Sequence, residues 1–285
     1  MLCLTLDGRT MKENSAIFKR HKACVSMLEL RLDMLNLSDN SELLAAKNFP
    51  GFAGMPVILT IRRNFDGGRF HGSEDERKTL LREFSRCGFS YVDLEVDLNF
   101  PSLEYELMEA RVQIIRSIHD FKGMPDVRDL QELAKAISSC GEIPKFAVTP
   151  KSVQDQLKLV KLSLRLDGIR KIIIGMGIYG LPLRILYRRL GSLLTFCSEN
   201  DPNRIGLPSP EDLHFVYRSD SLTENSLTEN TKLIALPIFN TSSCGSFTPA
   251  ARRGDSACIP FHLSDTAEDR KAFAELCALL GVSAV

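Results

Sequence analysis

Short apolar runs alternate with longer segments of helical periodicity along the first 219 residues of the chain. The apolar runs predict strands at 2–6, 25–31, 56–62, 90–95, 112–118, 144–149, 170–174 and 192–197. The periodic segments predict helices at 10–20, 41–48, 74–87, 101–110, 126–139, 151–166, 181–190 and 209–217. Strict alternation of strand and helix predicts parallel strands. Eight such units match a (β/α)8 barrel of the α/β class, and a doubly wound open sheet is the main alternative.

The pattern changes after this segment, where Ser-Leu-Thr-Glu-Asn occurs twice in tandem over 221–230. This stretch is polar and lacks apolar periodicity, so we interpret 220–231 as a linker. Residues 232–285 resume the alternation, with strands expected at 232–239 and 257–263 and an amphipathic helix from 266 to a stop at Gly281. So short a segment makes a poor independent core, and we expect a small C-terminal α/β extension, either docked on the barrel or part of a second domain.

Composition and charge narrow the class of protein. The 285 residues are 44% hydrophobic and 25% charged with a formal net charge of zero, which suits an ordinary globular core and provides no long-range attraction to nucleic acid or anionic membranes. No apolar run approaches the roughly 18 residues of a membrane helix. The eight cysteines are scattered without a CxxC pair, so neither a metal site nor a disulfide framework is expected. A cytoplasmic, reduced protein fits these observations.

Charged residues gather where the predicted strands end, which in a barrel is the catalytic face. Glu29, Arg31 and Asp33 alternate with leucines, and in a strand they would face the same side. Three charges facing a barrel interior are costly unless they are paired or used. Asp93 and Glu95 occupy similar positions near the end of the fourth predicted strand.

A lysine in an apolar strand adds candidate chemistry. Lys145 lies in EIPKFAVTP, where apolar surroundings disfavour the ammonium form and leave an amine that attacks ketones. His119 ends the preceding predicted strand and is suited to proton transfer, while Arg62 and Arg184 offer planar forks for a carboxylate. Taken singly, each residue also has a structural interpretation, such as a snorkelling lysine or an ion-pair ladder. Their shared placement at strand ends favours catalysis.

These segments resemble the type I 3-dehydroquinate dehydratases over roughly residues 1–217. The matching motifs, in the family's order, are ELRLDML (29–35), LTIRRNFDGGRF (59–70), YVDLEVD (91–97), IIRSIHDF (114–121), GEIPKFAVTP (141–150), GMGIYGLPLRIL (175–186) and SLLTFCS (192–198). The resemblance implies dehydration of 3-dehydroquinate to 3-dehydroshikimate in the shikimate pathway of aromatic amino-acid biosynthesis. It implies no metal and no organic cofactor, because a covalent imine is the electron sink. The expected partner is this small-molecule substrate, and a homodimer is compatible.

The same resemblance implies a role for each matching residue. Lys145 would form the imine, His119 would serve as general base and then general acid, and Glu95 would orient and polarise that histidine. The residues expected to contact the substrate hydroxyls and carboxylate are Glu29, Arg31, Arg62 and Arg184. The family's last loop carries a serine and a glutamine that close over the substrate, and here Asn203 and Leu207 stand in their places. Asp66 replaces a glutamate in the glycine-containing loop.

The C-terminal extension resembles the opening of a shikimate dehydrogenase substrate domain, as found in fused dehydratase–dehydrogenase chains. The similarity is better in the strand and helix of 257–280 than in the shikimate-binding turn, where Thr241 and Ser243 stand. The segment precedes the lysine–aspartate pair and the NADP domain of that family. The resemblance therefore implies that 232–285 is a partial substrate-domain fragment without activity of its own.

Three rival interpretations remain at this point. Gly175–Gly180 forms a GxGxxG after an apolar run, with Glu199 further on, which is typical of an NAD(P)-binding oxidoreductase. However, it follows six strand–helix units, and a glycine turn after the seventh strand of a barrel also suits anion binding. A class I aldolase uses the same lysine chemistry. A degenerate barrel that serves as a non-catalytic binding module is the third interpretation, motivated by the altered lid positions.

Overall fold

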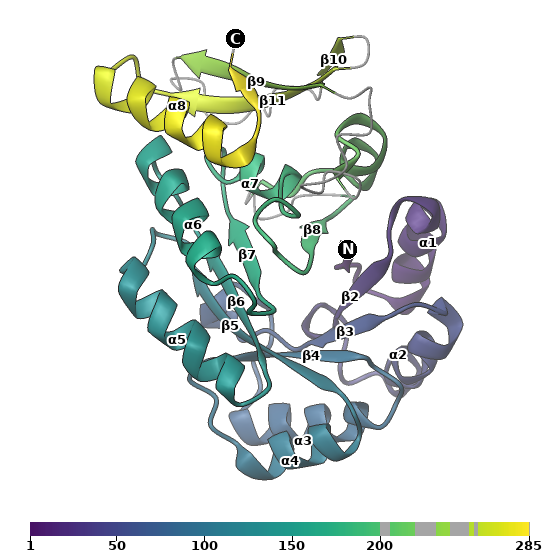
Figure 1. Ribbon diagram of the computed structural model, residues 1–285. Coiled ribbons are helices and arrows are strands. Elements are labelled where there is room, and N and C mark those ends of the chain that lie inside the picture. Colours follow the sequence, from purple (N-terminus) through teal and green to yellow (C-terminus); the bar gives the residue numbers. More distant parts are fainter. Residues whose placement is uncertain (200–205, 220–231, 240–250, 254–255, 285) are drawn as a thin grey trace. The chain divides into compact units, whose positions relative to one another are not determined.

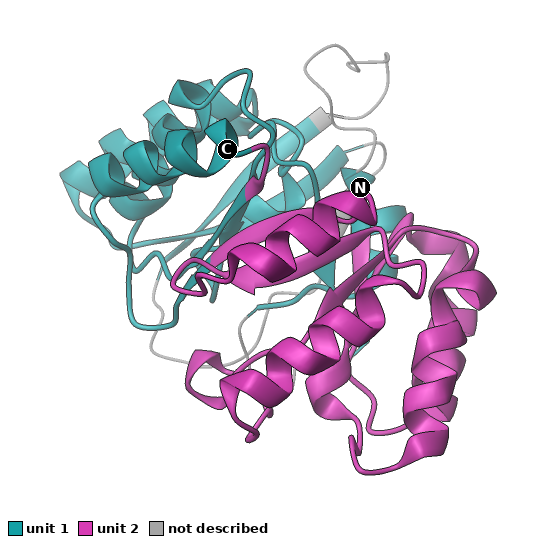
Figure 2. Cartoon of the chain, turned by 90° about the horizontal axis from the view of Figure 1, so that it is seen from below, with its two compact units in different colours: residues 1–2, 118–140, 144–285 teal, residues 3–117, 141–143 magenta. Residues whose placement is uncertain are grey.

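The computed structural model describes residues 1–199, 206–219, 232–239, 251–253 and 256–284. The chain forms two compact units (Figure 2). The first comprises residues 1–2, 118–140 and 144–285, and the second comprises residues 3–117 and 141–143. The predicted tandem linker at 220–231 lies outside the described residues.

Eight parallel strands and their intervening helices confirm the predicted barrel fold (Figure 1). The strands are β1 (Leu2–Leu6), β2 (Met27–Arg31), β3 (Val57–Thr60), β4 (Tyr91–Glu95), β5 (Gln113–Asp120), β6 (Ile143–Val148), β7 (Ile172–Gly175) and β8 (Thr195–Cys197). The helices are α1 (Met11–His21), α2 (Asn40–Ala53), α3 (Glu74–Ser85), α4 (Pro101–Glu109), α5 (Val127–Ser139), α6 (Val153–Arg165) and α7 (Leu181–Ile185). The sheet order β7-β6-β5-β4-β3-β2-β1-β8 places sequence neighbours beside one another, and a parallel bridge joins Lys171 to Ser192. This is the strand order of a (β/α)8 barrel.

Strands β1 to β3 show why these residues form a barrel sheet. They pair in parallel, for example Leu4 with Leu28 and Leu28 with Val57, and nearly all their residues are buried. Burial on both faces requires the near-continuous apolar runs of the sequence, because helices cover one face and the barrel interior fills the other. The predicted start of α3 is confirmed by a capping box between Ser73 and Glu76.

Two of the predicted elements are wrong in detail. Strand β2 ends at Arg31, and Asp33 lies in a 3-10 turn over Leu32–Met34, so Glu29, Arg31 and Asp33 do not continue one alternating strand. The turn is stable because the Asp33 carboxylate accepts hydrogen bonds from Arg31 and from the backbone N–H of Arg69. The helix predicted at 181–190 ends at Ile185 and continues as turns up to Gly191, which adopts a left-handed conformation.

The C-terminal extension, defined here as residues 232–284, forms its own four-stranded sheet in the first unit. Strands β9 (Lys232–Phe239) and β11 (Ser256–Leu263) pair in parallel, β12 (Ser283–Ala284) pairs in parallel with β9, and β10 (Ala251–Arg253) pairs antiparallel with β11. The sequence pattern missed β10, because its three residues are too few for a period-two signal. Helix α8 (Ala267–Leu280) ends at Gly281 in the left-handed region, as predicted.

The extension packs on barrel helix α6 through α8 (Figure 1). The α8 face that contains Phe273, Leu276 and Cys277 is buried, and the Phe273 ring meets that of Phe261 edge-on at 5.4 Å between centroids. Burial raises the pKa of the Cys277 thiol to about 11, so this side chain stays neutral at physiological pH. None of the helices in the described ranges is long and apolar enough to cross a membrane.

His262 makes the stability of the extension depend on pH. It is buried in β11, and this burial lowers the pKa of its imidazole below the ordinary value. The unfolded chain therefore binds a proton at a higher pH than the folded chain does, and stability falls as the pH drops from about 6.5 toward the folded pKa. We expect the thermal unfolding temperature of the wild type to fall more steeply between about pH 7 and pH 5 than that of His262→Asn.

The matched control is His71→Asn, which changes an exposed histidine and should keep the wild-type pH dependence. Differential scanning fluorimetry at several pH values measures all three proteins. Parallel pH profiles for the wild type and His262→Asn would contradict the prediction.

Candidate active site

A buried charge cluster in the second unit connects the carboxyl ends of β3 and β4 with Ser117 of β5. Arg62 follows β3, and its Nη2 donates to Asp93 Oδ1 at 2.8 Å while its Nη1 donates to Glu95 Oε1 at 2.9 Å. The same Nη1 donates to the hydroxyl of Ser117 on β5 at 3.2 Å. Arg62 Nε makes no hydrogen bond within the part of the chain that the structure describes. The guanidinium is thus held by carboxylates on one side and retains donors for a further anion.

Glu95 lies between two arginines. Its second oxygen, Oε2, accepts from Arg77 Nη1 at 2.7 Å, and Arg77 also donates to the carbonyl of Ile61 at 3.1 Å. Burial acts to lower the pKa of Arg62, but the charges of Asp93 and Glu95 outweigh it and raise that pKa above its usual value. Arg62 therefore stays charged, and its buried charge is compensated by fixed carboxylates rather than by water.

Two further predicted substrate contacts lie on β2. Glu29 is buried and accepts hydrogen bonds from the hydroxyls of Thr5 at 3.0 Å and Thr60 at 2.9 Å. Arg31 makes a bidentate pair with Asp33 at 2.9 and 2.7 Å. Burial acts to raise the pKa of Asp33, but the charge and hydrogen bonds of Arg31 outweigh it and lower that pKa. Asp33 is therefore ionised and orients the Arg31 guanidinium.

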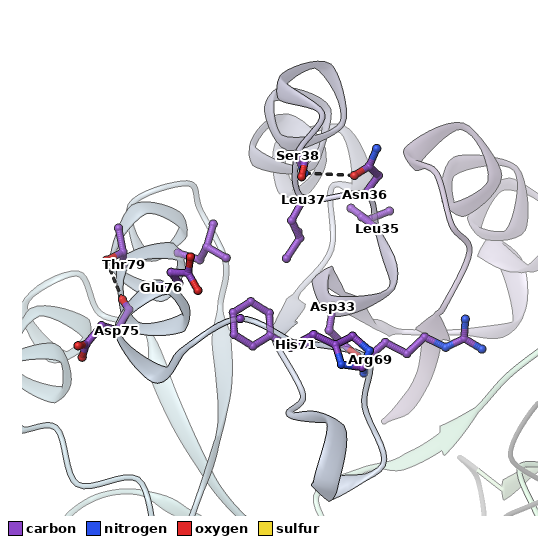
Figure 3. Close-up of a pocket in the computed structure, with 13 residues that line it drawn as sticks. Asp33, Leu35, Asn36, Leu37, Ser38, Arg69, His71, Asp75, Glu76 and Thr79 are labelled. Carbon is purple, nitrogen blue, oxygen red and sulfur yellow. Dashed lines mark hydrogen bonds between the residues drawn. The ribbon is translucent and has the colours of Figure 1, made fainter.

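A cavity of about 800 Å³ opens beside this pair (Figure 3). Its lining comes from the loop after β2, the segment 69–72 and the first turns of α3, and it includes Asp33, Leu37 and Phe70. None of the seven predicted site residues lines it. Asp33 connects the cavity to the predicted site through its hydrogen bonds to Arg31 and to the backbone of Arg62.

Lys145 lies in the first unit, at the third position of β6, where its side chain is 4% exposed. Its Nζ lies over the ring of Phe196 on β8, 4.5 Å from the centroid. The negative face of an aromatic ring stabilises a cation placed above it. This lysine is therefore an inward-facing, buried amine and not a snorkelling surface residue.

His119 is in the same unit, near the end of β5. It is half-buried, and its ring stacks with that of Phe121, with 6.2 Å between centroids. The segment that follows is fixed, because the Thr149 hydroxyl donates to the carbonyl of Asp120 at 2.8 Å and the Asp120 side chain accepts from the backbone of Gly123. The end of β5 therefore holds the imidazole at the catalytic face of the barrel fold.

Arg184 is also in the first unit, on α7, and is 1% exposed. Its Nε donates to the carbonyl of Gly175 at 2.7 Å, across the glycine turn, defined here as residues 175–180. Gly175 and Gly180 approach so closely that a Cβ on Gly180 would lie 2.1 Å from the carbonyl carbon of Gly175. The glycines of the GxGxxG motif therefore serve close backbone packing and the anchoring of Arg184.

The structure brings Arg62 together with Glu95, and it places Glu29 and Arg31 on one strand of the same unit. Lys145, His119 and Arg184 belong to the other unit. The sequence missed Arg77 and Phe196 as members of these clusters. Arg77 falls at helical spacing with the buried Leu81 and Phe84, a signal that places it on the inner face of α3 despite its charge. For Phe196, the sequence carries no local signal.

The fold first defines the class: a (β/α)8 barrel, the fold in which active sites lie at the carboxyl ends of the strands. Residues 2–224 match the model of the family described as type I 3-dehydroquinase, and the chain belongs to this family. It is 30% identical over 202 residues to a 3-dehydroquinate dehydratase from Methanocaldococcus jannaschii, a match that covers 70% of this chain and 88% of the relative.

Solved structures agree with this assignment. The crystal structure of 3-dehydroquinate dehydratase from Geobacillus kaustophilus superposes with a TM-score of 0.68 at 26% identity, covering 76% of this chain and 89% of that one. A structure of dehydroquinate dehydratase and shikimate dehydrogenase from S. pombe AroM covers 95% of this chain and 54% of that one, with a TM-score of 0.63. At 19% identity, that second similarity concerns the fold alone.

The predicted lid positions are described only in part. Asn203 lies outside the described residues, as do Thr241 and Ser243 of the extension. Leu207 is described and is half-buried, in the segment between β8 and the π-helical turn Asp212–Val216.

Proposed function

We propose that this protein converts 3-dehydroquinate to 3-dehydroshikimate through an imine on Lys145, without a metal or an organic cofactor. The observation that carries the proposal is the placement of Lys145, a buried amine over the face of Phe196 in the middle of a barrel strand. A buried amine is protected from bulk water, which favours attack on a ketone and slows hydrolysis of the imine. The ring of Phe196 stabilises the positive charge of the protonated imine.

The proposed reaction begins with an imine between Lys145 and the substrate. Lys145 Nζ attacks the ketone carbon of 3-dehydroquinate. The carbonyl oxygen leaves as water, and a carbon–nitrogen double bond forms between the substrate and the lysine. His119 removes a proton from the carbon next to the imine, and the electron pair moves toward the positively charged nitrogen. The hydroxyl on the adjacent carbon leaves, takes a proton from His119 and departs as water. Hydrolysis of the imine then releases the conjugated product and restores Lys145 and His119.

The cationic side chains recognise the substrate. From the family resemblance we assign Glu29, Arg31 and Arg62 to the substrate hydroxyls and carboxylate, and Arg184 to the carboxylate. Arg62 keeps N–H donors that are not committed to Asp93 or Glu95, as a carboxylate ligand requires. Glu95, which the family resemblance assigns to the orientation of His119, is hydrogen-bonded to Arg62 and Arg77, so we also give it the role of a residue that positions Arg62.

The proposed organisation is a dehydratase barrel over 1–219, a linker over 220–231 and a segment over 232–285 that is similar to part of a shikimate dehydrogenase substrate domain. The fold similarity to the S. pombe AroM structure supports the last part, because it extends over 95% of this chain. We place the enzyme in the cytoplasm, where its scattered cysteines remain reduced. Those that the structure describes form no disulfide bond with one another.

Trapping the imine tests this function. The protein is mixed with 3-dehydroquinate, reduced with borohydride, digested and analysed by mass spectrometry, while a parallel sample is followed by the absorbance of the enone product. We expect a reduced adduct on the peptide that contains Lys145 and a rise in absorbance without added metal. Absence of both the adduct and the product would overturn the proposed function. An adduct on another lysine would overturn the assignment of Lys145.

A further inference from the structure

We propose that the C-terminal extension is a working part of the dehydratase, in which His262 and Tyr179 are positioning residues that hold Arg184 through the glycine turn. This inference rests on the proposed function, because it takes Arg184 as a ligand of the substrate carboxylate. The residues concerned lie within the first unit, between β11 of the extension and α7 of the barrel.

The extension is anchored to the barrel helices at several points. Gln154 of α6 donates to the buried carboxylate of Asp269 at 2.6 Å, and Lys161 of α6 pairs with Glu275 of α8 at 2.6 Å. Arg189 donates to the carbonyls of Leu280 and Gly281 at 2.5 and 2.9 Å. A buried carboxylate that satisfies a barrel side chain is costly to expose without its partner. The extension is therefore docked in one orientation and presents β11 to the barrel.

Tyr179 is where this docked strand meets the glycine turn. Its ring lies edge-on to the imidazole of His262, with 6.2 Å between ring centroids and 67° between planes. Its backbone carbonyl accepts from Gln156 Nε2 of α6 at 2.5 Å. Burial raises the pKa of the Tyr179 hydroxyl, and the nearby charge of Asp269 raises it further, so the phenol remains neutral. The ring of Tyr179 is thus in contact with the extension, and its backbone is hydrogen-bonded to the barrel.

The glycine turn transmits this constraint to Arg184. Gly177 adopts a left-handed conformation with φ of 72°, and the N–H of Gly180 donates to the Gly177 carbonyl at 3.0 Å, so the turn closes on itself. The backbones of Gly175 and Gly180 are in direct contact. A shift of Tyr179 therefore moves Gly180 against Gly175, whose carbonyl accepts from Arg184 Nε at 2.7 Å. Close-packed backbone contains no free volume that could absorb such a shift.

Arg184 itself is embedded in the same contacts. It lies on α7, a helix of five residues that packs against β7, β8 and β11. So short a helix has little stability of its own, and its orientation depends on its neighbours. The extension therefore fixes the direction of the Arg184 guanidinium, and a small displacement of a substrate-binding group has a large effect on binding.

The test compares variants of the full chain in steady-state kinetics with 3-dehydroquinate. Tyr179→Ala removes the ring, and we expect KM to rise about tenfold with kcat within about twofold of the wild type. Tyr179→Phe keeps the ring and should restore the wild-type KM. His262→Ala, which removes the partner from the extension, should raise KM to the same extent. The matched control is Tyr105→Ala, which removes an exposed tyrosine from α4 and should leave both constants unchanged.

A structural readout accompanies the kinetics. Hydrogen exchange followed by mass spectrometry should show faster exchange over 176–186 in Tyr179→Ala and His262→Ala than in Tyr179→Phe. Wild-type KM and wild-type exchange in His262→Ala would overturn the inference even if Tyr179→Ala failed to fold. A lower kcat together with a lower thermal unfolding temperature, but with an unchanged KM, would also overturn the inference. A wild-type protein without dehydratase activity would instead count against the proposed function.

Discussion

Replacement of Lys145 by alanine is expected to abolish turnover of 3-dehydroquinate, with kcat reduced by about four orders of magnitude or more. The nucleophilic nitrogen is lost, and no imine can serve as the electron sink. Lys145→Arg is the complementary variant. Its guanidinium would place a positive charge over the Phe196 ring but would not form an imine with the substrate ketone. Both variants should fold, and neither should give a borohydride adduct. Steady-state absorbance assays and mass spectrometry measure the two effects.

His119→Gln provides the complementary result. This variant keeps Lys145 and should still give the adduct, while proton transfer slows by about 10²-fold to 10⁴-fold. Activity in Lys145→Arg near that of the wild type would refute imine chemistry on this residue. A normal rate in His119→Gln would refute the assignment of the acid–base role.

The second large effect is expected for stability. Arg77→Leu should lower the free energy of unfolding by about 3–5 kcal/mol, the usual cost of removing one partner from a buried ion pair. The Arg77 side chain is 0% exposed and donates to Glu95 Oε2 at 2.7 Å. Its loss leaves a buried carboxylate oxygen with Arg63 Nε, 3.9 Å away, as the remaining cation. Urea unfolding followed by circular dichroism measures the change.

Arg82→Leu is the matched control on the same helix. Arg82 pairs with Glu106 at 3.1 Å, but these side chains are 39% and 32% exposed, so the loss should stay within about 1 kcal/mol. The double variant Arg77→Leu, Glu95→Leu should recover part of the loss, because the buried Glu95 oxygen that Arg77 satisfies is removed as well. A value for Arg77→Leu equal to that of Arg82→Leu would contradict the proposed role of this buried pair.

These two predictions concern different requirements of the same fold. In the proposed function Lys145 supplies the reactive amine, whereas Arg77 and Glu95 hold Arg62 in a fixed direction by hydrogen bonds. A rigid cation at a strand end binds a carboxylate without first reorganising, which favours catalysis over an equally charged mobile side chain. The expected result is that Arg77 variants mild enough to fold also show a raised KM.

The GxGxxG motif illustrates how a motif depends on its context. By sequence, Gly175–Gly180 is also typical of a dinucleotide-binding turn. In the structure, the two end glycines touch each other, and Arg184 donates to the turn from the following helix. The spacing is thus explained by the need for backbone contact after β7. The glycine spacing indicates that the backbone approaches another group closely, but it does not identify that group.

The sequence by itself determined the barrel fold and the candidate chemistry. Strand and helix have different periods of apolar residues, and this signal is local, so all eight strands were predicted within a few residues of their observed positions. Lys145, His119 and Arg184 were selected as candidates for a similar reason, because a charged or titratable residue within or just after an apolar run is visible without knowledge of distant neighbours. The stop of α8 at Gly281 was equally readable.

Tertiary structure alone decided which charges pair and where the extension packs. The Asp33 carboxylate sits in a turn, not in a strand, because it accepts a hydrogen bond from the backbone of Arg69, 36 residues away. From the sequence, Arg77 is typical of an exposed arginine on a helix. In the fold it is buried and donates a hydrogen bond to Glu95 on β4. The contact of Tyr179 with His262 joins the glycine turn after β7 to strand β11 of the extension. Pairings of this kind depend on packing between distant segments, and no local period in the sequence records them.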